Sequence, residues 1–338
     1  MSRWAVGLLA LAVPALAACE APADRAVVAV LAPGDTATLA AEPGRTAFAE
    51  RIAQRCPDCL VRVHTEGATP EVLREVLADG ADVVVVEALT ADQGEALVAT
   101  AGSVPLVAFD RYFDGADYFV SYDRSSTGAE VAEAVSRGIR RGSSALVVNG
   151  STTDTDLDLV EDGLREGFAV GEVDVAAALE PATATAGETR DWVRRQLAEG
   201  RPRMIGAVVT VSDEQAVGAL AALRSSAVRR ADWPMVTGVG ADLAAVRRII
   251  DGGQTLSVHM PIGVTAVRAA DLALALASET SPDLAGSIDY EGVPAFVHVP
   301  VVITRDNVTD VVVRDGTFTT EELCSGSVEA TCARLGIR

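Results

Sequence analysis

Two Asp-Arg dipeptides in the first half of the chain each follow an apolar run. Residues 105–109 lead into Asp110 and Arg111, and residues 118–122 lead into the second dipeptide. Six of the fourteen aromatic residues lie in the same stretch. Carboxylate and guanidinium groups accept and donate the hydrogen bonds that sugar hydroxyls need, while aromatic rings cover the apolar face of a sugar. The stretch therefore predicts a binding site for a polyhydroxylated ligand, with a buried ion pair beside packed rings as the alternative.

No catalytic or metal-binding pattern accompanies this stretch. None of the three histidines belongs to an HxH or HxxxH pattern, and residues 150–151 are not part of a GxSxG elbow. The acids around Asp154 lack the glycine and the distal glutamate of a calcium loop. All 28 basic residues are arginine, which excludes a P-loop lysine and a Schiff-base lysine. We therefore expect no enzyme, no cofactor and no metal.

Length and composition indicate a two-domain globular protein. The 338 residues can bury a large core, and 49% hydrophobic with 22% charged residues is typical of an α/β protein. The formal net charge of −20 argues against nucleic acid as a partner and against electrostatic docking on anionic lipid.

The N-terminus predicts export. An apolar run over residues 4–18 follows Arg3 and is too short and wrongly flanked for a membrane span. The sequence Leu16-Ala17-Ala18-Cys19 resembles the lipobox of bacterial lipoproteins, where residues 1–18 would be removed and Cys19 lipidated. We expect a lipid anchor on the outer face of the cytoplasmic membrane. An ordinary secretory signal cut before Cys19 is the alternative and predicts the same compartment without the anchor.

The other four cysteines fall into two local pairs. Cys56 and Cys59 have CxxC spacing, and Cys324 and Cys332 lie eight residues apart near the C-terminus. Disulfides are the expected state of such pairs in an exported chain. The first bridge would clip a turn and the second would fasten the tail. A zinc site built from all four cysteines is the alternative.

Apolar runs typical of buried parallel strands alternate with helical patterns along most of the chain. Four strand–helix units precede residues 118–122, and a second series begins with a helix predicted over 127–141. The predicted fold class is therefore α/β, with two doubly wound parallel-sheet lobes. A strand at 255–259, an extended segment at 295–304 and a short strand at 310–313 predict that the chain recrosses between the lobes and forms a multi-strand hinge.

This alternation gives approximate lobe boundaries. Residues 19–25 form a linker, 26–123 with about 257–285 form the first lobe, 124–256 with about 286–323 form the second, and 324–338 form the tail. Ligand groups are expected on loops at the carboxyl ends of the strands. The candidates there are Asp110, Arg111, Asp154, Ser212, Asp213 and His259.

Four stretches along this layout resemble the type I periplasmic sugar-binding proteins of ABC transporters, with the LacI-type fold of the xylose- and ribose-binding proteins. They are VPLVAFDRYFDGADYFVSYDRSSTGAEVAEAV, VVTVSDEQAVGALAAL, VTGVGADLAAVRRIIDGGQTLSVHMPI and VPAFVHVPVVITRDNVTDVVVRDGTFTTEEL, and the resemblance covers about residues 26–323. It implies reversible capture of a monosaccharide-like solute between two closing lobes and delivery to a membrane permease. It also implies a monomer that carries out no covalent chemistry.

The resemblance carries over to three residues directly. Asp110 and Arg111 match the Asp-Arg pair with which the family grips its sugar. Asp213 fits the acid that opens the helix after its strand. Asp154, Ser212 and His259 are weaker ligand-site candidates because they rest on their loop positions.

Elsewhere the expected pocket departs from the family pattern. Ser212 stands where the family usually has asparagine, Gly240 where it has a ligand-binding aspartate, and Met260 where it has a lysine. The tryptophan expected before the next helix is absent, with Ala184 nearby. Hydrogen bonds to charged partners are worth about 1.5–3 kcal/mol each, so these losses change the ligand or the role. The alternative function is a non-transport sensor or partner-binding lipoprotein on the same fold.

Overall fold

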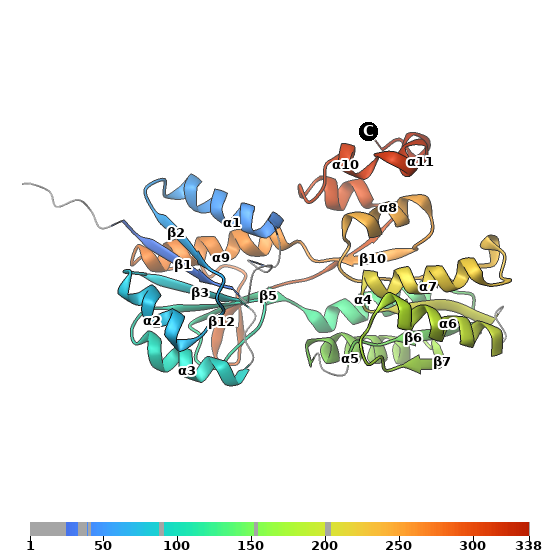
Figure 1. Ribbon diagram of the computed structural model, residues 1–338, viewed down its shortest axis with the longest axis horizontal. Coiled ribbons are helices and arrows are strands. Elements are labelled where there is room, and N and C mark those ends of the chain that lie inside the picture. Colours follow the sequence, from blue (N-terminus) through green and yellow to red (C-terminus); the bar gives the residue numbers. More distant parts are fainter. Residues whose placement is uncertain are drawn as a thin grey trace, which may run out of the picture.

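The computed structural model describes residues 25–32, 39, 42–87, 91–151, 155–199 and 204–337. The predicted signal peptide, Cys19 and Asp154 lie outside these residues. The described chain forms two α/β lobes and a C-terminal tail, residues 314–337, which is longer than the predicted one and packs on the second lobe (Figure 1). Among the described residues, no helix is long and apolar enough to cross a membrane.

The first lobe is built on a seven-stranded sheet in the order β11-β12-β5-β4-β3-β1-β2, parallel except for β11. Its central strands are nearly continuous valine-rich runs, because helices cover both faces of the sheet and favour apolar side chains on both. Helices α1 and α9 cover one face, and α2 and α3 cover the other. The elements are β1 (Val27–Leu31), α1 (Glu42–Arg55), β2 (Leu60–His64), α2 (Pro70–Ala78), β3 (Val83–Glu87), α3 (Ala91–Ala101), β4 (Leu106–Phe109), β5 (Tyr118–Tyr122), α9 (Ile262–Ala277), β11 (Ile288–Tyr290) and β12 (Val293–His298).

The second lobe has a four-stranded parallel sheet in the order β7-β6-β8-β9. Helices α4 and α5 cover one face, and α6 and α7 cover the other. A side chain on Gly128 of α4 would overlap the carbonyl of Val160, so glycine lets these two helices approach closely. The elements are α4 (Arg124–Gly138), β6 (Ser144–Val148), α5 (Thr155–Val170), β7 (Asp174–Leu179), α6 (Ala186–Glu199), β8 (Ile205–Thr210), α7 (Asp213–Ser225), β9 (Met235–Val236) and α8 (Leu243–Asp251).

Three connections join the lobes within the described residues. The chain passes from β5 into α4, from β10 (Leu256–His259) into α9, and from β12 into β13 (Val301–Thr304). Strands β10 and β13 pair with each other in antiparallel fashion, and Val258 of β10 bridges to Val239 of the second lobe. The predicted fold class and its multi-strand hinge are confirmed.

Two expectations about the last part of the chain are wrong. The sequence predicts residues 286–323 in the second lobe, but β11 and β12 extend the first sheet because Ala295–His298 pairs in register with Phe119–Tyr122. The strand predicted at 310–313 is a helical turn, Thr309–Val313, which follows a turn in which Asn307 accepts a hydrogen bond from the Thr304 amide (2.8 Å). Val312 anchors that turn in the core beneath the tail.

The tail is tied to the second lobe by packing and by a covalent bridge. Helices α10 (Thr320–Leu323) and α11 (Glu329–Leu335) lie against α8, with Leu323 and Cys332 buried there. Cys324 and Cys332 form a disulfide with a Cα–Cα distance of 5.8 Å, and Cys56 and Cys59 form the other at 5.3 Å. Both predicted disulfides are confirmed.

Candidate functional site

A cavity of about 520 Å³ lies at the junction of the lobes. Its lining residues come from the carboxyl ends of first-lobe strands, from α4 and α5, and from the second-lobe loop over residues 239–242. Others come from the second crossing, which is the connection from β10 to α9, and from the tail. This is the position that a doubly wound fold offers to a ligand. Its lining consists of Asp110, Arg111, Tyr122, Arg124, Thr127, Leu157, Val160, Val239, Gly240, Ala241, Asp242, His259, Met260, Ile262, Thr317 and Phe318.

Asp110 enters this cavity from a strained backbone position. It directly follows β4 and has a φ of 70°, in the left-handed region that non-glycine residues seldom adopt. Its amide donates to the Val120 carbonyl (2.9 Å), which holds the turn against β5. Strain of this kind costs of order 1–3 kcal/mol and clusters at functional sites.

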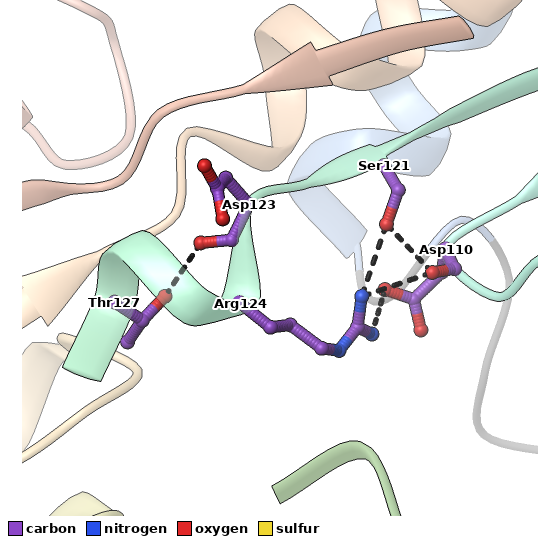
Figure 2. Close-up of polar contacts among 5 residues, drawn as sticks. All are labelled: Asp110, Ser121, Asp123, Arg124 and Thr127. Atoms are coloured by element: carbon purple, nitrogen blue, oxygen red, sulfur yellow. Dashed lines mark hydrogen bonds and ion pairs between the residues drawn. The ribbon is translucent and has the colours of Figure 1, made fainter. Parts of the chain in front are cut away.

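Arg124 holds the Asp110 carboxylate and carbonyl together (Figure 2). Its Nη2 donates to Asp110 Oδ1 at 2.8 Å, and its Nη1 donates to the Asp110 carbonyl at 3.1 Å and to Ser121 Oγ at 3.0 Å. Ser121 in turn donates to the same carbonyl at 2.6 Å. The side chains of Arg124 and Asp110 are only 18% and 23% exposed, so the ion pair is partly shielded from water.

The position of Arg124 is fixed by the start of α4. Asp123 caps this helix by accepting a hydrogen bond from the Ser126 amide (2.9 Å), and Thr127 donates to the Asp123 carbonyl (3.2 Å). Arg124 is the first residue of the helix, and the helix belongs to the second lobe. The ion pair therefore joins the end of a first-lobe strand to the beginning of a second-lobe helix.

Sequence reasoning missed Arg124. Asp110 and Arg111, which the sequence predicts as ligand residues, both line the cavity. The guanidinium that contacts the Asp110 carboxylate, however, belongs to Arg124. The signal was present in the sequence, because the second Asp-Arg dipeptide follows the strand that lies next to β4 in the sheet.

Tyr122 brings an aromatic ring to the cavity. Its side chain is nearly buried, and its hydroxyl has no hydrogen-bond partner among the described residues. Burial raises the pKa of the Tyr122 phenol well above its usual value; the neighbouring Thr265 hydroxyl offsets this in part, although its approach lacks hydrogen-bond geometry. The phenol is therefore neutral at physiological pH.

His259 lies at the cavity but binds the tail. Its buried Nε2 is 2.7 Å from Asp315 Oδ2 and 3.3 Å from Thr317 Oγ1. Thr317 also donates to Asp315 Oδ1 through its amide (2.9 Å) and its hydroxyl (2.7 Å). These contacts hold the tail segment 315–318 so that Thr317 and Phe318 form part of the cavity wall.

The structure places Ser212 and Asp213 in the framework of the second lobe and not in the cavity lining. Ser212 caps α7 by accepting from the Gln215 amide (3.2 Å). The buried Asp213 carboxylate accepts from Gln254 Nε2 (2.7 Å) and from Ser257 Oγ (2.8 Å). Burial raises the pKa of Asp213, and the hydrogen bonds from Gln254 and Ser257 offset part of that rise.

Asp213 also orders the loop over residues 238–242. Its Oδ2 accepts from the Asp242 amide at 3.2 Å, and a side chain on Gly238 would overlap its carboxylate. Gly240, with a φ of 120°, lines the cavity, as does Met260. Ala184, with a φ of 52°, lies in the loop before α6 and is not among the lining residues.

A second cavity, of about 460 Å³, lies between α1 and the end of α9 on the first lobe. Arg51 and Asp271 line it and neutralise each other in a two-pronged ion pair (2.7 and 2.9 Å). It takes no residue from the second lobe, so the cavity at the junction is the better candidate for a ligand held by both lobes.

Comparison with known sequences identifies relatives over most of the chain. The family described as periplasmic binding protein domain matches residues 66–281. The D-xylose-binding periplasmic proteins of Haemophilus influenzae and Escherichia coli are 28% and 27% identical to the chain over 239 and 235 residues. Each alignment covers 65% of this chain and 68% of the relative.

Solved structures show the same fold. A periplasmic ribose ABC transporter protein from Conexibacter woesei superposes with a TM-score of 0.73 at 16% identity, over 89% of this chain and 98% of that one. An ABC transporter solute-binding protein from Clostridium phytofermentans with bound β-D-glucose gives 0.68 at 18% identity, over 88% and 99%. At these identities the likeness concerns the fold alone.

The Asp213 network predicts a pH-dependent contribution to stability. We expect Asp213→Asn to lower the free energy of unfolding by about 1–3 kcal/mol, because an amide cannot accept from all the donors around it. Since burial raises the pKa of Asp213, the native protein binds more protons than the unfolded chain between the ordinary and the raised value. The difference in the free energy of unfolding between the wild type and the variant is then largest below the ordinary pKa. It falls as the pH rises through the raised pKa.

Urea unfolding of both proteins between about pH 3 and about pH 7 measures this difference. Asp162→Asn is the control, because Asp162 forms an exposed ion pair with Arg165. A difference in the free energy of unfolding that grows with pH would contradict a raised pKa for Asp213.

Proposed function

We propose a solute-binding function for this chain, which belongs to the periplasmic binding protein domain family. It is the extracytoplasmic binding protein of an ABC importer: it holds one monosaccharide-like solute between its lobes and delivers it to a membrane permease. The observation that carries the proposal is the Asp110–Arg124 pair, with Arg111 beside it, on a cavity shared by both lobes. Capture is reversible and needs no covalent step.

The pair suits a sugar hydroxyl. Arg124 occupies Oδ1 of Asp110, and Oδ2 makes no hydrogen bond to any described residue. That oxygen can accept from a hydroxyl, while the guanidinium groups donate to neighbouring ligand oxygens. Charge-assisted hydrogen bonds of this kind are worth about 1.5–3 kcal/mol each, and a ring such as Tyr122 covers the C–H face of a sugar.

Three crossings between the lobes support a closing motion. Because the cavity takes groups from both lobes, a solute that contacts both binds the closed arrangement more tightly and shifts the population toward it. The names of the two sequence relatives support the ligand class, since both are D-xylose-binding periplasmic proteins.

We also propose that the protein is exported and anchored through Cys19. The lipobox-like sequence before Cys19 supports the anchor, and the family supports the compartment. A binding protein held beside the membrane meets its permease at a high local concentration. We expect a monomer, since one chain supplies both walls of the cavity.

The ligand site can be tested by thermal shift with pentoses, hexoses and polyols. A solute that binds the folded state raises the melting temperature by mass action. We expect one or more sugars to do so, and Asp110→Asn to weaken binding by roughly tenfold or more because a charged acceptor is lost. Asp162→Asn, which alters an exposed pair on α5, serves as the matched control. A folded protein that responds to none of these solutes would count against sugar capture and favour the sensor or partner-binding role.

The anchor can be tested by detergent phase partitioning of the protein expressed with its own N-terminus. Wild type should enter the detergent phase, because an acyl chain gains about 0.8 kcal/mol per buried methylene. Cys19→Ser should stay in the aqueous phase. Wild type that is exported but remains aqueous would instead support an ordinary secretory signal.

A further inference from the structure

The cavity between the lobes receives charged groups from one side and apolar groups from another. Asp110 and Arg111 come from the first lobe, and Arg124 comes from the first residue of α4. The residues from α5, from the second-lobe loop, from the second crossing and from the tail are largely apolar. They are Leu157, Val160, Val239, Ala241, Met260 and Phe318.

Three backbone donors of the second-lobe loop are used within the protein. The Gly240 amide donates to the Val258 carbonyl (2.9 Å), and the Ala241 amide donates to Ser257 Oγ (3.1 Å). The next amide, that of Asp242, donates to the buried Asp213 carboxylate (3.2 Å). Three successive N–H groups that border the cavity are therefore satisfied inside the protein.

The polar side chains beside this apolar set are also engaged. Thr127 donates to the Asp123 carbonyl, and His259 and Thr317 bind Asp315. Asp242 caps α8 with Oδ1 (2.6 Å from the Ala245 amide), and its side chain is exposed to water. Among the described lining residues, this part of the wall offers a buried ligand hydroxyl little that it can bond.

We propose that the solute is a hydroxylated ring that carries an apolar substituent, such as a 6-deoxyhexose or an alkyl glycoside. This rests on the proposed function, and it specifies the ligand of the same site. The hydroxyl groups meet Asp110 and the arginines, and the substituent meets Met260, Val160 and Phe318. A hydroxyl in that second position loses its water without gaining a partner, whereas a methyl group gains from burial.

Calorimetric titration of the purified protein with matched sugar pairs tests this. The pairs are D-fucose with D-galactose, L-rhamnose with L-mannose, and n-butyl β-D-xyloside with D-xylose. In each pair that binds, we expect the member with the apolar substituent to bind about tenfold more tightly, from the gained methyl burial and the avoided unpaired hydroxyl.

Substitution of Met260 tests whether the apolar side of the cavity is the source of the preference. Met260→Gln places an amide of similar length on the apolar side, and we expect it to reduce the preference within the pair by about fivefold or more. Met260→Leu keeps the wall apolar and should retain the preference. Melting curves of both variants establish that they are folded before titration.

The outcomes distinguish the proposal of an apolar substituent from the proposed function of sugar capture. Tighter binding of the more hydroxylated member, lost in Asp110→Asn, would overturn the apolar-substituent proposal and leave sugar capture standing. A preference that survives Met260→Gln unchanged would also overturn it, because the wall would not be its source. Failure of the folded wild type to bind any of the six probes would overturn sugar capture and this inference together.

Discussion

The contact between Asp110 and Arg124 is the constraint around which the site is arranged. One partner ends a strand of the first lobe and the other begins a helix of the second, so their ion pair fixes the geometry at the first crossing. The unusual backbone of Asp110 persists because Ser121 and Arg124 both bind its carbonyl. One oxygen of this partly shielded pair, Asp110 Oδ2, accepts from no described residue. In the proposed function it binds a ligand hydroxyl without rearrangement of the pair, which lowers the entropic cost of binding.

The rest of the cavity depends on buried polar contacts that face away from the ligand. The buried Asp213 carboxylate accepts a hydrogen bond from the 238–242 loop, and His259 holds the tail through its contact with Asp315. Each contact satisfies groups that would be costly if left unpaired in the interior. The consequence is a wall in which the Gly240, Ala241 and Asp242 amides are bonded within the protein. It lies beside the Asp110 carboxylate, whose Oδ2 accepts no hydrogen bond from a described residue. We propose that this arrangement selects a ligand by the positions of its polar groups as well as by its shape.

The fold was largely predictable because its signals are local. Runs such as Val83–Val86 are typical of buried parallel strands, and the helices between them follow from the spacing of their apolar residues. The lobe to which β12 belongs was not predictable, because it is decided by pairing with Phe119–Tyr122, far away in the sequence. The same limit applies to the site. Asp110 was found from its place after a strand, but the partner of its carboxylate depends on a φ of 70° and on the start of α4. Asp213 was predicted as a ligand residue from its place after a strand. Its structural role depends on Gln254 and Ser257, about forty residues further along the chain, which bind its carboxylate.

Whether Asp110 and Arg124 act as one anchor can be measured by a double-mutant cycle on ligand affinity. The variants are Asp110→Asn, Arg124→Gln and the two combined, each titrated with the tightest-binding sugar. If the pair binds the solute as a unit, either single change removes most of the anchor, and the double variant loses less than the sum by about 1 kcal/mol or more. Losses that add within about 0.5 kcal/mol would show that the two side chains act independently, and would contradict the central role given to their contact.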